Sequence, residues 1–184
     1  PTGYPARRVW LRLQGRDGRT PIFSVGDPEA DGRIRGVRDE RRIPHTSLVR
    51  NPSDVVVYEA VPLDGEGAPT TRLLTMSSMG KDTRLLPKGW RADGPHGGET
   101  APVGVADDPD FVAGGDTVHV DIALPKSAGK DLLVVAWLLY QPIPPSWVAP
   151  LRDLATDEAR AFVRMYDAAG PTPETLALTT RREG

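Results

Sequence analysis

Apolar residues occupy every second position near the start of the chain, at Val9, Leu11 and Leu13. This two-residue period predicts a half-buried strand. A Gly-rich turn at 15–18 and the run at 21–25 predict its hairpin partner. Segment 26–42 has almost no periodicity and predicts a long exposed loop.

Three later segments also have strand patterns. The β-branched run at 54–61 predicts a strand, and 72–76 is a candidate for another. Residues 117–124 alternate cleanly between apolar and polar. Residues 132–141 are apolar on both faces, as in a central strand covered on both sides. A turn at 127–130 predicts that these last two segments form an antiparallel hairpin.

One helix is predicted over about 156–169. Thr156 is a suitable N-cap, acidic residues follow it, and Gly170 stands just past the expected end. Phe162 and Met165 lie on one helical stripe that we expect to be buried. Residues 178–184 carry little pattern, and we expect them to fray.

Nineteen Gly and nineteen Pro exclude long helices over much of the 184-residue chain. We therefore predict a mainly β fold, an antiparallel β-sandwich of immunoglobulin or fibronectin type with one short C-terminal helix. Residues 1–177 are expected to form a single domain, because no stretch resembles a linker between two cores.

The chain contains no cysteine, which excludes disulfides, thiolate metal sites and the Cys-x-x-Cys-His attachment of a c-type haem. Its longest apolar run, Leu132–Tyr140, has nine residues, about half of what a membrane-spanning helix needs. The net charge of −2 does not indicate a protein that binds nucleic acid over its whole surface. The charge is unevenly distributed, with +5 on residues 1–50 and −7 on residues 51–184.

Three motifs resemble one family. The first is Pro-Thr-Gly-Tyr-Pro-x-Arg-Arg-x-Trp at 1–10, the second is Lys-Asp-x-Arg-Leu-Leu-Pro-x-Gly-Trp at 81–90, and the third is Tyr-Gln-Pro-Ile at 140–143 followed by Trp147, Phe162 and Met165-Tyr166. In this order they resemble the β-rich domain that follows the haem region in multihaem c-type cytochromes. The chain starts inside the first motif, which favours a longer polypeptide upstream.

The resemblance implies an extracytoplasmic, non-enzymatic accessory domain that docks on a cytochrome or a larger respiratory or photosynthetic complex. Haem would be carried by the partner only. The alternative is an extracellular ligand-binding module, for example for carbohydrate, with or without Ca²⁺. Hydrolytic chemistry is disfavoured because no nucleophile motif accompanies the available Ser, His and Asp residues.

Candidate site residues fall into three groups. A loop rich in arginine predicts a docking surface for an acidic cytochrome face, against the alternative of a solvated loop. A Gly-rich stretch with four carboxylates is a Ca²⁺ candidate, although it lacks the spacing of a helix-loop-helix site. His45 resembles a histidine of the related domain and is a candidate for approaching a partner's haem. The loop residues are Arg33, Arg35, Arg38, Arg41 and Arg42, and the carboxylates are Asp107, Asp108, Asp110 and Asp116.

Overall fold

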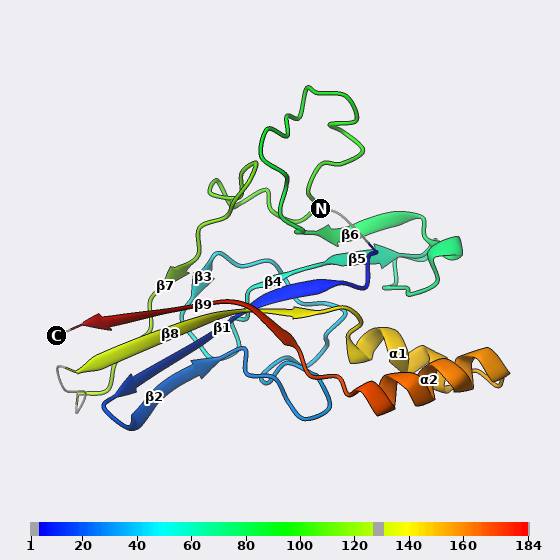
Figure 1. Ribbon diagram of the computed structural model, residues 1–184. Coiled ribbons are helices and arrows are strands. Elements are labelled where there is room, and N and C mark those ends of the chain that lie inside the picture. Colours follow the sequence, from blue (N-terminus) through cyan, green and yellow to red (C-terminus); the bar gives the residue numbers. More distant parts are fainter. Residues whose placement is uncertain (1–3, 127–130, 184) are drawn as a thin grey trace.

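The computed structural model describes residues 4–126 and 131–183, and its largest element is a five-stranded antiparallel sheet (Figure 1). Its strands are β1 (Arg8–Asp17), β2 (Thr20–Val25), β4 (Val57–Tyr58), β8 (Leu132–Gln141) and β9 (Glu174–Glu183). The order is β2-β1-β8-β9, and β4 pairs with the first part of β1. β1 and β8 pair over ten residues, from Arg8 opposite Gln141 to Asp17 opposite Leu132.

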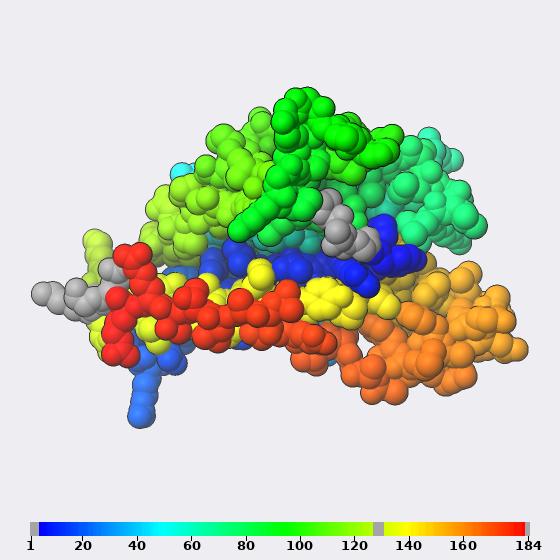
Figure 2. All heavy atoms as spheres, turned by 45° about the horizontal axis from the view of Figure 1, so that its top comes forward, coloured from blue at the N-terminus to red at the C-terminus, as the bar shows by residue number. Residues whose placement is uncertain are grey.

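Two small sheets lie on one side of this large sheet (Figures 1 and 2). β5 (Ala60–Leu63) pairs antiparallel with β6 (Ser78–Asp82), and β3 (Leu48–Val49) pairs parallel with β7 (His119–Val120). The strands therefore form two layers, and the mainly β, antiparallel character expected from the sequence is confirmed.

The buried core is centred on β1 and β4. Trp10 is fully buried, as are Val57 and the neighbouring Val49. The same cluster contains Leu13, Val25, Ile34, Ile43, Val55, Val56, Tyr58, Leu86, Phe111 and Leu139. Segments distant in the sequence thus meet around the first strand.

The described part of the chain contains two α-helices at one end of the sheet, where one was expected. α2 (Asp157–Ala169) has the predicted bounds: the Thr156 side chain accepts from the Ala159 N–H, and Gly170 ends the helix with a positive φ of 76°. Its predicted stripe is not buried, because Met165 is 64% exposed and Phe162 is only partly buried. α1 (Pro145–Arg152) was not predicted. The prolines at 142–145 predicted only the end of the preceding strand. A backbone N–H in the first helical turn has no partner within the helix, so Pro145, which lacks an N–H, can begin α1 without the loss of a hydrogen bond.

The early hairpin and the central strand are confirmed by the β1–β2 pairing and by β8 lying between β1 and β9. The predicted hairpin of 117–124 with 132–141 is wrong, because β1 and β9 take both edges of β8, and β7 pairs with β3. The turn expected at 127–130 lies outside the described residues. Segment 72–76 contains a 3₁₀ turn (Leu73–Thr75) in place of a strand.

The C-terminal segment does not fray as expected. Residues 174–183 form β9, which pairs with β8 from Glu174 opposite Tyr140 to Glu183 opposite Leu132. Backbone hydrogen bonds to the neighbouring strand β8 fix this segment. β9 therefore provides the outer edge of the large sheet.

Candidate functional site

The arginine-rich segment 26–42 is largely neutralised by its own acids. It contains five arginines and five carboxylates. Arg33 pairs with Asp31, with Nε and Oδ2 2.7 Å apart, and Arg35 pairs with Asp27. Arg41 and Arg42 both approach Asp39 within 4 Å, and Arg38 is exposed. The predicted docking arginines do lie on the surface, but they do not make it strongly basic.

The same segment covers one end of one sheet face, so it is not fully exposed as expected. Trp10 Nε1 donates to the Gly26 carbonyl at 2.9 Å. Arg8 donates to the Gly32 carbonyl and forms an ion pair with Glu40, both at 3.1 Å. Ile34 is 1% exposed. The segment thus buries the end of the sheet nearest the helices.

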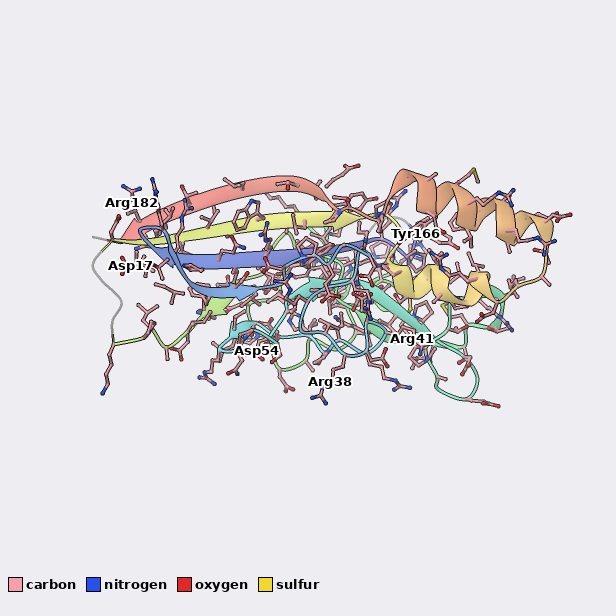
Figure 3. The ribbon with its side chains drawn as sticks, turned by 90° about the horizontal axis from the view of Figure 1, so that it is seen from below. Asp17, Arg38, Arg41, Asp54, Tyr166 and Arg182 are labelled. Atoms are coloured by element: carbon pink, nitrogen blue, oxygen red, sulfur yellow. The ribbon has the colours of Figure 1, made fainter. Side chains whose placement is uncertain are left out.

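The other end of this face is open. Directly opposed residues of antiparallel strands share a face, and the pairing places Arg12, Trp137 and Leu178 in one row across β1, β8 and β9. A second row contains Arg16, Leu133 and Arg182, with Val135 between the rows. We call these seven residues the open sheet face. Figure 3 looks at the sheet from below, with Arg182 and Asp17 labelled at the end opposite the helices.

The open sheet face combines an apolar floor with a cationic rim. A groove of about 480 Å³ is lined there by Leu133, Val135, Trp137 and Leu178, and by the exposed Arg16 and Arg19 of β1 and the β1–β2 turn. The Arg12 guanidinium lies 4.5 Å from the centre of the Trp137 ring. Aromatic and arginine side chains are enriched in protein interfaces.

β9 borders this face with an open edge. Leu176 and Leu178 are 54% and 56% exposed, and Figure 2 shows the strand, in red, as an uncovered strip along the molecule. Within the described residues β9 pairs with β8 only. A long exposed edge strand with apolar side chains is a surface on which another chain can pair.

A second cluster contains His45, which the sequence suggested for a haem contact, and Asp108, which it suggested for Ca²⁺ binding. His45 Nε2 lies 2.6 Å from Asp108 Oδ2, and the two side chains are only 6% and 4% exposed. Asp116 accepts a hydrogen bond of 2.7 Å from the Tyr58 hydroxyl. His45, Asp108 and Asp116 each offer a ligand atom within 4.8 Å of the others.

The fold does not gather the four candidate Ca²⁺ carboxylates. Asp108 and Asp116 lie together, whereas Asp107 and Asp110 are exposed, and Asp110 faces His119 at 3.3 Å. The approach of His45 to a partner's haem stays a prediction; within the described chain its side chain is buried and Nε2 contacts Asp108. Tyr58 was not identified from the sequence as part of any site.

The motif residues mostly build the interior. Arg8 Nε of the first motif donates to Gln141 Oε1 of the third at 2.9 Å, and the Tyr4 and Trp147 rings lie 5.7 Å apart. Lys81 of the second motif is buried beside Glu59, with Nζ and Oε1 3.1 Å apart. Residues 1–3 of the first motif lie outside the described residues. The motifs thus specify contacts that hold the fold together.

Comparison with known proteins gives little. No family model matches the chain, and no curated protein matches it. Among solved structures, the chain is similar to a penta-heme cytochrome c552 from Thermochromatium tepidum, with 16% identity and a TM-score of 0.47. The alignment covers 99% of this chain and 32% of that protein, so the chain spans about a third of its length. A similarity this low does not establish a shared fold.

Two features bear on haem and membranes. The absence of cysteine leaves the chain without a covalent c-type haem site. Neither of the helices in the described ranges is long and apolar enough to cross a membrane.

Proposed function

We propose that this chain is a non-enzymatic, extracytoplasmic accessory domain that docks on a c-type cytochrome, or on a larger membrane-bound electron-transfer complex, and stabilises it. The observation that carries the proposal is the open sheet face, where an apolar floor is rimmed by arginines beside an open strand edge. We therefore assign the proposed docking surface to β1, β8 and β9 instead of segment 26–42.

The charge of this surface favours a partner with an acidic surface. Arg16, Arg19 and Arg182 are exposed at its rim, and Arg182 approaches Asp131 at 3.6 Å. A complementary partner surface is acidic, with apolar residues at its centre. The three motifs that resemble the cytochrome-associated domain direct the choice of partner to a haem protein.

Affinity capture tests the partner. The chain is immobilised and exposed to detergent-solubilised membranes of the organism that makes it, at low salt, and retained proteins are stained for covalent haem. We expect a c-type cytochrome to be retained and to be released as salt rises, because rim charges act mainly through long-range attraction. If no haem protein is retained at any salt concentration, the proposed function is wrong.

Charge reversal tests the surface. With the captured cytochrome purified, Arg16→Glu combined with Arg182→Glu is expected to weaken binding at least about tenfold at low salt. Arg38→Glu is the matched control, since Arg38 is an exposed arginine of segment 26–42. Equal weakening by the control would move the docking surface to segment 26–42 and refute its placement on the sheet.

A further inference from the structure

The cluster around His45 is assembled from parts of the chain that are far apart. His45 precedes β3, Tyr58 lies in β4, and Asp108 and Asp116 lie between β6 and β7. Phe111 packs edge-on against the His45 ring, with centroids 5.7 Å apart. The cluster thus ties an irregular segment to the core through buried polar groups.

Two of its buried atoms have no partner. Among the described residues, four buried side-chain nitrogen or oxygen atoms lack a hydrogen-bond partner, and His45 Nδ1 and Asp116 Oδ1 are two of them. Asp116 Oδ1 is an acceptor, and an unpaired acceptor in the interior is costly. The proton of a neutral imidazole can lie on either ring nitrogen, so Nε2 can present a lone pair to a cation while Nδ1 keeps the proton. What the cluster lacks is a donor or a positive charge.

The carboxylates are held in place by donors behind them. Asp108 Oδ1 accepts from the Asp110 N–H at 3.1 Å, and Asp116 Oδ2 accepts from the Tyr58 hydroxyl at 2.7 Å. The site is therefore a region of negative potential with one oxygen of each carboxylate already oriented.

We propose that His45, Asp108 and Asp116 bind a divalent transition-metal ion of the Zn²⁺ class. One imidazole nitrogen and two carboxylate oxygens form a ligand set that Zn²⁺ accepts, with a water completing the tetrahedron. Hydrogen bonds from Tyr58 and the Asp110 backbone then act as the outer support that carboxylate ligands of metals commonly have. Ca²⁺ fits less well, because it needs six to eight oxygen ligands.

Binding requires a small adjustment. Metal bonds of about 2.0–2.2 Å set neighbouring ligand atoms about 3.3 Å apart in a tetrahedron. The present separations extend to 4.8 Å, while His45 and Asp108 approach to 2.6 Å. Asp116 therefore moves inward and the His45–Asp108 contact opens as the ion enters; Nε2 then holds the ion through its lone pair, and the ring keeps its proton on Nδ1.

Titration with Zn²⁺ and with Co²⁺ tests the site on the full chain, using calorimetry for Zn²⁺ and visible absorption for Co²⁺. We expect one ion per chain, an intense Co²⁺ absorption typical of four-coordination, and a rise in Tm with Zn²⁺. Asp116→Asn and His45→Gln should each weaken binding at least about tenfold, and Tyr58→Phe should weaken it by about tenfold. Ca²⁺ should not compete.

Asp107→Asn is the matched control, because it removes the same charge from an exposed neighbour in the same segment. It should leave Zn²⁺ affinity within about twofold of wild type. Circular dichroism of each variant checks that it folds, and Tyr58→Phe tests the site with the three ligands intact. Absence of binding to the wild-type chain, or equal weakening by Asp107→Asn and Asp116→Asn, would overturn the proposal.

Discussion

Arg8 and Arg16 lie on the same strand and the same face of the large sheet, yet their surroundings differ completely. Arg8 is 1% exposed, with hydrogen bonds to Gln141 and Gly32 and an ion pair to Glu40. Arg16 is exposed beside Leu133, at the edge of an apolar groove. The difference is the covering segment 26–42, which lies over Arg8 and ends before Arg16.

This comparison separates structural from functional arginines. At the covered end the guanidinium is enclosed with a carboxylate, so it contributes to the fold and is inaccessible to a partner. At the open end the guanidinium stays in water beside a groove whose floor includes the exposed Leu178 and the partly exposed Leu133 and Trp137. A docking partner could supply the cover that segment 26–42 supplies at the other end.

The largest expected effect is on the covered end. Arg8→Ala removes the partner of Glu40, which is also buried, and leaves an uncompensated charge in the interior. We expect Arg8→Ala to lower the free energy of unfolding by about 3–5 kcal/mol, which urea denaturation would measure. Replacing both residues, as Arg8→Met with Glu40→Met, should restore most of the loss, because no buried charge then remains. A loss below about 1 kcal/mol for Arg8→Ala contradicts this account.

A smaller effect is expected at the boundary between the two ends, where Asp27 accepts hydrogen bonds from Ser24 at 2.6 Å and Arg12 at 2.7 Å. Burial raises the pKa of Asp27, but these bonds outweigh burial and hold it below the ordinary 3.8. The ionised form is thus favoured in the folded state. Its contribution is present above pH 3.8 and is lost as pH falls through the lower folded value.

Asp27→Asn should therefore cost about 1.5–3 kcal/mol at pH 7, the usual value of hydrogen bonds to a charged group. The difference from wild type should shrink as the pH is lowered below 4, which unfolding curves at pH 7 and in acid would measure. Asp31→Asn is the control, since Asp31 is exposed and pairs only with the exposed Arg33. A difference for Asp27→Asn that is constant with pH would show that the charge is not responsible.

The third effect concerns the floor of the open end. Trp137→Leu keeps an apolar residue in the row but removes the ring beneath Arg12. A cation–π contact at a partly exposed site contributes about 0.5–1 kcal/mol. The free energy of unfolding should fall by at least that amount, because the ring also packs against the core. The double variant Trp137→Leu with Arg12→Met tests the coupling, and additive losses would show that the two side chains do not interact.

Local signals predicted the elements that depend on local chemistry. The alternation at Val9, Leu11 and Leu13 gave the first strand, and the Thr156 cap and Gly170 gave both ends of α2. β9 was missed because its pairing with β8 is non-local, although Leu176 and Leu178 keep a two-residue period. Strand formation depends on neighbours as much as on the segment itself.

The candidate sites depend on the fold even more strongly. Arginine density pointed to segment 26–42, but the interleaved acids pair with those arginines. The open face joins Arg16 to Arg182, which only the register of β1, β8 and β9 brings together. His45 and Asp108 were both noticed in the sequence, but as parts of two unrelated sites, because nothing local indicates that they touch.

The smallest effect on stability gives the sharpest form of the comparison. Arg16→Ala makes the same substitution as Arg8→Ala, on the same strand and face, at a position exposed to water. Surface substitutions of this kind change the free energy of unfolding by less than about 0.5 kcal/mol. The same urea titration measures both variants. A loss for Arg16→Ala that approaches the loss for Arg8→Ala would mean that Arg16 also supports the fold, and the open end would then not be available to a partner.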